Sequence, residues 1–187
     1  MFTALLRSVA VCARPLRPFR RLVRDNSGAT AVEFSIVAAP FLALLVGLVQ
    51  TAAVFLAGRE LDEAVAQASR YILTGQAQNT NMTQAQFKSW VCQNIYALFN
   101  CNNLMIDVQT YPTFAAVSTS APTLTYNAQG QVTNSWSFTP GGPGEIVVVQ
   151  VMYQWPVFLG PLGFNLSNLG NGDRLLMSTA VFQNEPY

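Results

Sequence analysis

One carboxylate, Glu33, stands out as a group able to do chemistry, because it lies at the edge of a long uncharged stretch. The next 25 residues, from Phe34 to Gly58, contain no charged side chain. An ionisable group beside a membrane span is a functional candidate, and its natural partner is a cation. The alternative is that Glu33 lies at the interface in the first turn of a helix, where the helix dipole favours an acid. The residue alone does not separate these two roles.

The sequence offers little other chemistry. It has no histidine, which excludes Ser-His-Asp and Cys-His catalysis and histidine-based zinc sites and removes the usual general base near neutral pH. The segment Asn165–Asp173 carries oxygen ligands that calcium could use, but with one carboxylate it is more typical of a turn. An enzyme is therefore the least favoured class, and neither a cofactor nor a metal is expected.

The composition and the distribution of charge point to a membrane protein. Hydrophobic residues make up 51% of the 187 residues and charged residues only 10%, against about 25% charged in typical soluble proteins. The mean hydropathy is +0.28, and the net charge of +1 gives no field that favours nucleic acid. The first 28 residues nevertheless carry a charge of +5 and the remainder −4. The basic residues of this N-terminal segment are Arg7, Arg14, Arg17, Arg20, Arg21 and Arg24.

The uncharged stretch Phe34–Gly58 is long enough to span a membrane as a helix. It would measure roughly 37 Å, against roughly 30 Å for the hydrocarbon core. Pro40 and Gly47 would weaken a soluble helix but are tolerated in membrane helices. The arginines before the stretch predict a cytoplasmic N-terminus and a C-terminal body on the opposite side. A buried core helix, a secretory signal peptide and an Arg-rich mitochondrial presequence explain the pattern less well.

The junction between the basic segment and the apolar stretch has a distinctive order of residues. Gly28 ends the basic segment, four small or apolar residues follow, and Glu33 comes fifth with an aromatic residue behind it. This order resembles a class III signal, the processing site of type IV pilin-like proteins. Together with Pro40, the Val-rich Glu145–Trp155 and the C-terminal Ala180–Tyr187, it is similar to the TadE-like pseudopilins of tight-adherence pilus systems.

The resemblance implies roles for the residues at this junction. A membrane prepilin peptidase would cut between Gly28 and Ala29, and Glu33 and Phe34 would then act in assembly and recognition. The new ammonium on Ala29 would meet Glu33 of a neighbouring subunit. Because desolvation offsets much of their attraction, this pair would fix axial register more than add stability. The major pilins often have tyrosine where this chain has Phe34, which favours a minor component.

The resemblance also implies partners and a location. The partners would be the prepilin peptidase, pilin and other pseudopilin subunits packed through the N-terminal helix, the inner-membrane pilus platform and the membrane itself. The protein would be a single-pass protein of the bacterial inner membrane with a periplasmic head, and a candidate for incorporation into an extracellular pilus.

Beyond Gly58 the helix is expected to continue with one apolar face. The face lies opposite charged residues, and Gly75 is predicted to end the helix. A Gln/Asn/Thr-rich linker is expected at Gln76–Asn81. The apolar positions are Leu61, Ala64, Val65, Ala68 and Ile72.

A second helix is predicted to begin at Thr83, where Gln86 completes a capping box. Cys92 and Cys101 flank its end. In an extracytoplasmic head this pair is expected to form a disulfide, which would contribute roughly 2.5–3 kcal/mol in the chain-entropy model. The third cysteine, Cys12, lies in the leader. The residues expected on the apolar face of this helix are Phe87, Val91, Ile95 and Leu98.

Strand patterns dominate the rest of the chain. Strands are predicted at Met105–Thr110, Gln131–Thr139, Glu145–Trp155 and Asp173–Gln183, the third of them buried on both faces or nearly so. The Ser/Thr/Pro-rich Tyr111–Gly130 is expected to be a loop. Helices followed by strands indicate an α+β fold with an antiparallel sheet packed on the long helix.

We therefore predict a pilin-like α+β protein in three parts. Residues 1–28 form a basic cytoplasmic leader that is cleaved, residues 29–75 a transmembrane and extended amphipathic helix, and residues 76–187 an extracytoplasmic head with a short helix and an antiparallel sheet. The predicted function is that of a minor pilus subunit that assists assembly of a tight-adherence pilus for surface attachment. The alternative is an uncleaved single-span protein whose head binds an envelope or secretion-complex partner.

Overall fold

The computed structural model describes residues 28–95, 98–158 and 163–186. The predicted leader, apart from Gly28, lies outside them. The chain divides into two compact units, Met1–Leu42 and Ala43–Tyr187. Helix α2 (Ala29–Leu73) begins in the first unit and ends in the second.

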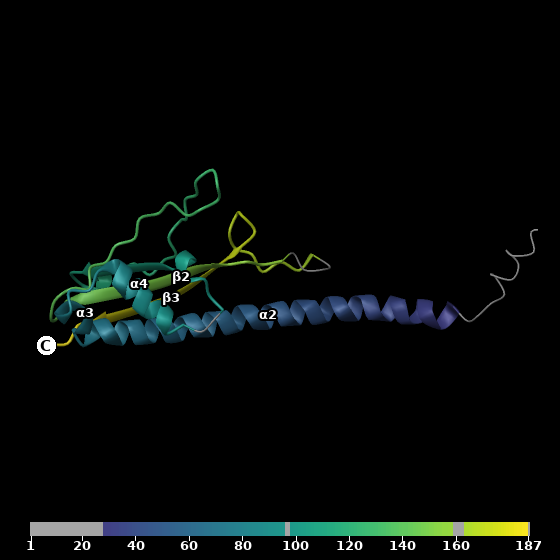
Figure 1. The fold of residues 1–187 in the computed structure, drawn as a ribbon, viewed down its shortest axis with the longest axis horizontal. Helices are drawn as coiled ribbons and strands as arrows, with labels where there is room; N and C mark the ends of the chain where they lie inside the picture. The colour runs from purple at the N-terminus through teal and green to yellow at the C-terminus, as the bar shows by residue number, and fades with distance from the viewer. Residues whose placement is uncertain (1–27, 96–97, 159–162, 187) are drawn as a thin grey trace, which may run out of the picture. The chain divides into compact units, whose positions relative to one another are not determined.

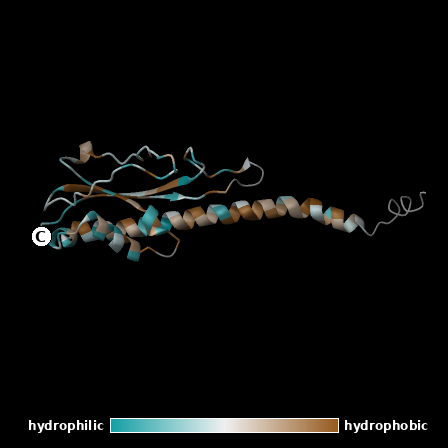
Figure 2. Cartoon of the chain, turned by 45° about the horizontal axis from the view of Figure 1, so that its top comes forward, coloured by the Kyte–Doolittle hydropathy of each residue, from teal (hydrophilic) through white to brown (hydrophobic). Residues whose placement is uncertain are grey.

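The N-terminal half of α2 is apolar on every side. Large side chains point outward in all directions, with Phe34 73% and Ile36 68% exposed in the first unit, and Leu48 65% and Val49 68% in the second. Figure 2 shows mostly hydrophobic colours along the middle of this helix. A helix that is hydrophobic all round is stable only when something apolar surrounds it. Among the described residues, α2 is the one helix long and apolar enough to cross a membrane.

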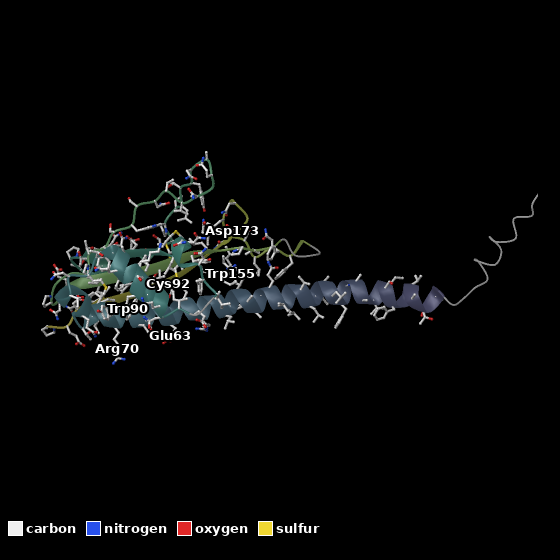
Figure 3. All side chains as sticks on the ribbon, viewed as in Figure 1. Glu63, Arg70, Trp90, Cys92, Trp155 and Asp173 are labelled. Atoms are coloured by element: carbon white, nitrogen blue, oxygen red, sulfur yellow. A yellow bond between two sulfur atoms is a disulfide. The ribbon has the colours of Figure 1, made fainter. Side chains whose placement is uncertain are left out.

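The C-terminal half of α2 has a single buried stripe, as the sequence predicts. The helix ends at Leu73, and Gly75, at φ 72°, donates its N–H to the carbonyl of Ile72 at 2.9 Å, which confirms the predicted stop. Glu63 and Arg70 lie on the side of α2 that faces away from the sheet (Figure 3). The buried residues of α2 are Val54, Ala57, Leu61, Ala64, Val65, Ala68 and Ile72.

The head has an antiparallel sheet that packs on this stripe (Figure 1). In the described residues the sheet has three strands, in the order β1 (Met105–Tyr111), β2 (Ile146–Trp155) and β3 (Arg174–Gln183). The central strand β2 is buried on both faces, as predicted, because α2 covers one face and the chain between β1 and β2 crosses the other (Figures 1 and 2). The strand residues in the core beside α2 include Ile106, Val108, Val147, Val149, Val151 and Leu176.

Helix α4 (Gln84–Gln93) forms beside α2 and is shorter than predicted. Its capping box is present, with the hydroxyl of Thr83 accepting from the N–H of Gln86. Phe87 and Val91 are buried, but the helix ends at Gln93. The next residue, Asn94, caps it, and its side-chain amide donates to the carbonyl of Trp90 at 2.8 Å. Leu98 is consequently 44% exposed and off the predicted face. The segment expected to be a linker contains the four-residue helix α3 (Gln76–Asn79).

The predicted strand at Gln131–Thr139, a segment that the structure describes throughout, does not form. Only its C-terminal end reaches the sheet, where the N–H of Val108 donates to Ser137 and the N–H of Thr139 donates to Val108, both at 2.9 Å. This segment thus forms only a two-bond parallel bridge with the outer edge of β1. The alternation of residues in 131–139 is not enough to make a strand, because strand formation depends on the partner available.

Candidate functional site

The segment from Gly28 to Phe34 stands at the start of α2 and is open to its surroundings. The helix begins at Ala29, directly after Gly28. Both residues are exposed, and a Cβ built on Gly28 would meet no atom within 4 Å. The peptide bond between them therefore lies at a helix start with no described side chain packed over it.

Glu33 lies one helical turn after Ala29, on the same face of α2. Its side chain is exposed. Among the residues that the structure describes, no basic side chain lies within 4.0 Å of its carboxylate. A carboxylate at the start of an apolar helix thus has room for a cation supplied from outside the described chain. This geometry is compatible both with an assembly role and with the simpler interfacial position.

Two hydroxyl groups in the N-terminal half of α2 are hydrogen-bonded within the helix. The hydroxyl of Ser35 donates to the carbonyl of Ala31 at 2.7 Å, and that of Thr51 donates to Gly47 at 2.8 Å. Pro40 lies inside the helix and has no N–H to donate. These bonds suit apolar surroundings, because each unpaired polar group there costs on the order of several kcal/mol.

The first charges after the apolar stretch fasten α2 to the sheet. Arg59 and Asp62 form an ion pair at 3.8 Å on the helix surface. The other carboxylate oxygen of Asp62 accepts a hydrogen bond of 2.7 Å from the hydroxyl of Ser178 on β3, which is buried. The two residues are 116 positions apart, and no local pattern marks them as partners. Sequence reasoning missed this contact.

A disulfide joins Cys92, at the end of α4, to Cys101, whose Cα atom lies 5.8 Å away. It ties α4 to the short 3-10 helix η2 (Cys101–Asn103) that precedes β1. Beside it, the ammonium of Lys88 donates to the carbonyl of Asn102 at 3.0 Å. Partial burial lowers the pKa of Lys88 from its usual value of 10.5. The disulfide and the Lys88 hydrogen bond both link α4 to η2.

The loop considered for calcium uses its oxygens for its own backbone. The Asn171 side-chain oxygen accepts from the N–H of Asp173 at 3.1 Å, and the Asn168 side-chain oxygen accepts from the N–H of Leu175 at 2.7 Å. Within the described ranges, no three His, Cys, Asp or Glu side chains gather as metal ligands. The geometry of this loop is that of a turn.

Comparison with known proteins locates one family. Residues 28–70 match the family described as TadE-like protein, a stretch that includes Gly28, Ala29, Glu33 and Phe34. The resemblance found in the sequence is thereby confirmed over this segment. The match is consistent with a TadE-like pilin of the tight-adherence system, and that family comprises structural pilus components and not enzymes. No curated protein and no solved structure matches the chain.

Proposed function

From the TadE-like match we propose that this chain is a prepilin-like minor subunit that assists assembly of a tight-adherence pilus used for surface attachment. The observation that carries the proposal is the position of the match, which covers residues 28–70. This stretch combines an exposed glycine, a carboxylate with room for a cation and a helix whose first half is apolar and exposed on all sides.

Processing is the first step of the proposed mechanism. A prepilin peptidase hydrolyses the bond between Gly28 and Ala29, which removes a leader of charge +5. The helix then no longer carries an arginine cluster at its cytoplasmic end. Each arginine would oppose passage through the bilayer by about 2.5–3.5 kcal/mol on insertion scales, so the processed helix is easier to draw into a filament.

Glu33 sets the position of the processed helix among its neighbours. Cleavage creates an ammonium on Ala29, and this cation is attracted to Glu33 of an adjacent subunit in the low dielectric of a helix bundle. Desolvation offsets much of that attraction, so the pair specifies register between subunits. Partners of this helix are other pilins and pseudopilins and the inner-membrane platform, with the head on the periplasmic side.

Co-expression with a prepilin peptidase tests the proposal. The intact mass of the membrane-extracted protein should fall by the mass of residues 1–28. Glu33→Gln should still be cleaved but should be lost from the assembled complex, measured by crosslinking to the major pilin. Glu63→Gln is the matched control, because Glu63 is an exposed acid farther along the same helix.

The outcomes separate the two predicted functions. A chain that keeps its full mass in its native cell contradicts processing and favours the uncleaved single-span alternative. Equal crosslinking of the Glu33 and Glu63 variants contradicts the role of Glu33 in register and leaves processing intact.

A further inference from the structure

The connection between β2 and β3 carries an exposed apolar surface that the proposed function does not use. No charged residue occurs from Ile146 to Gly172. Figure 3 labels the residues at the two ends of this connection, Trp155 and Asp173. Between them, Phe158 is 79% exposed and Phe164 is 40% exposed. Two exposed phenylalanines in one connection are unusual on a surface that faces water.

Two described residues of this connection, Phe158 and Phe164, contact the apolar half of α2. The side-chain amide of Gln50 donates to the carbonyl of Phe158 at 2.7 Å. The ring of Phe164 lies over Gly47, where an added Cβ would be 3.8 Å from its Cδ1 atom. Leu44 and Leu48 line the same shallow pocket of about 430 Å³. The ring therefore packs beside the helix at ordinary van der Waals distance, and the amide pairs a loop carbonyl that would otherwise face apolar surroundings.

This inference rests on the proposed function, in which α2 spans the membrane. The position of the contacts along α2 then sets their depth in the bilayer. A span needs about 20 residues. Every placement of that length inside the uncharged Phe34–Gly58 contains Ala39–Ala53, and therefore contains Gly47 and Gln50. The carbonyl of Phe158 and the ring of Phe164, which contact these two residues, must lie at the same depth. We infer that Phe158 and Phe164 insert into the hydrocarbon of the bilayer at the depth of Gly47 and Gln50 and anchor the head at a fixed height.

Lipid is the occupant that the contacts favour. Each backbone polar group at membrane depth must find a partner within the protein, and the Gln50–Phe158 bond supplies one for the carbonyl of Phe158. Where the apolar part of the connection ends, the guanidinium of Arg174 donates to the carbonyl of Leu166 at 2.9 Å. Arg59 and Asp62 line the same pocket as Arg174. Both arginines are placed to reach the phosphate level while their stems stay in apolar surroundings.

Site-directed fluorescence on the full chain tests this inference. In a Cys12→Ser background, Phe158→Cys and Phe164→Cys are each labelled with the fluorophore NBD and reconstituted into phosphatidylcholine–phosphatidylglycerol vesicles. Leu44→Cys reports the membrane span, and Asn171→Cys reports an exposed polar position of the same connection. The native disulfide does not react with the label. Quenching by acyl-chain doxyl lipid and by aqueous iodide is then compared, with circular dichroism to show that each variant is folded.

Labels at Phe158 and Phe164 should resemble the label at Leu44, with blue-shifted emission, strong lipid quenching and severalfold less iodide quenching than at Asn171. Iodide quenching equal to that at Asn171, with Leu44 still protected, overturns the inference and leaves the span intact. Protection from both quenchers shows that protein covers the connection, and it overturns the inference too. A water-exposed Leu44 refutes the membrane span of the proposed function and the inference with it.

Discussion

Adding one methyl group at three different glycines should separate processing from folding. Gly28 has no atom within 4 Å of its Cβ position. Gly144, at φ +77°, also has open space, whereas Gly141, at φ +70°, has Thr110 Cγ2 at 2.7 Å and Glu145 Oε2 at 3.0 Å. Each glycine is to be replaced by alanine in the full chain. The three variants differ in backbone conformation and in available space, and the added group is the same.

The expected loss of stability depends on the backbone conformation and on the space available at each glycine. A left-handed conformation costs an L-residue about 1–2 kcal/mol, and overpacking adds about 1–3 kcal/mol. Reduced freedom of the unfolded chain offsets about 0.4–1 kcal/mol. Gly141→Ala should therefore lower the free energy of unfolding by about 2–4 kcal/mol, and Gly144→Ala by about 1 kcal/mol. Gly28→Ala should leave it within about 0.5 kcal/mol.

Two measurements on the same samples decide the result. Urea unfolding in detergent, followed by near-ultraviolet circular dichroism, gives the stability of the head, and intact mass after co-expression with a prepilin peptidase gives processing. Gly28→Ala should block processing with a stable head, and Gly141→Ala should be processed with a weakened head. Equal destabilisation by Gly141→Ala and Gly144→Ala would refute the packing argument. Normal cleavage of Gly28→Ala would refute its place at the processing site.

Three further predictions concern the head. Replacing both Cys92 and Cys101 by serine should lower the free energy of unfolding by roughly 2.5–3 kcal/mol, and unchanged urea midpoints would argue against a constraining role for the disulfide. Burial lowers the pKa of Lys88, so the unfolded state binds more protons than the folded state between that lowered pKa and 10.5. The free energy of unfolding of the wild type should therefore rise relative to that of Lys88→Met as pH rises through this window. A stability difference between the two proteins that does not change with pH would contradict this. A double-mutant cycle with Asp62→Asn and Ser178→Ala should give a coupling energy of about 1 kcal/mol, and additive effects would show that their hydrogen bond contributes nothing.

Local periodicity accounts for the parts of the fold that the sequence predicts well. The stripe from Leu61 to Ile72 depends only on residues within four turns of one helix, and it packs as expected. The same holds for the capping box at Thr83 and for the nearly continuous apolar run of β2. At the junction, the order of Gly28 and Glu33 is likewise a local signal, which explains why it can be read without the structure.

Contacts between distant residues account for what could not be predicted. The alternation at Gln131–Thr139 is real, but strand formation requires a partner along its whole length, and β1 offers only the bridge at Val108. The end of α4 is set by Asn94 and not by the apolar period that continues to Leu98. The bond between Asp62 and Ser178 joins residues 116 positions apart, and the pairing of polar groups at that separation leaves no periodic signal.

The change in surface along α2 makes assembly and folding separable by mutation. Before Val54, large apolar side chains are exposed on all sides of the helix, and from Val54 onward a stripe rich in alanine and valine is buried against the sheet. Alanines at positions 57, 64 and 68 carry no side-chain rotamer freedom to lose when the sheet packs on them. Exposed positions before Gly58 contribute little to the core of the head, so a substitution there that abolishes assembly without changing the unfolding curve acts on contacts with lipid or other subunits. A substitution within the buried stripe must first be shown to leave the head folded before any loss of assembly is assigned to an interface.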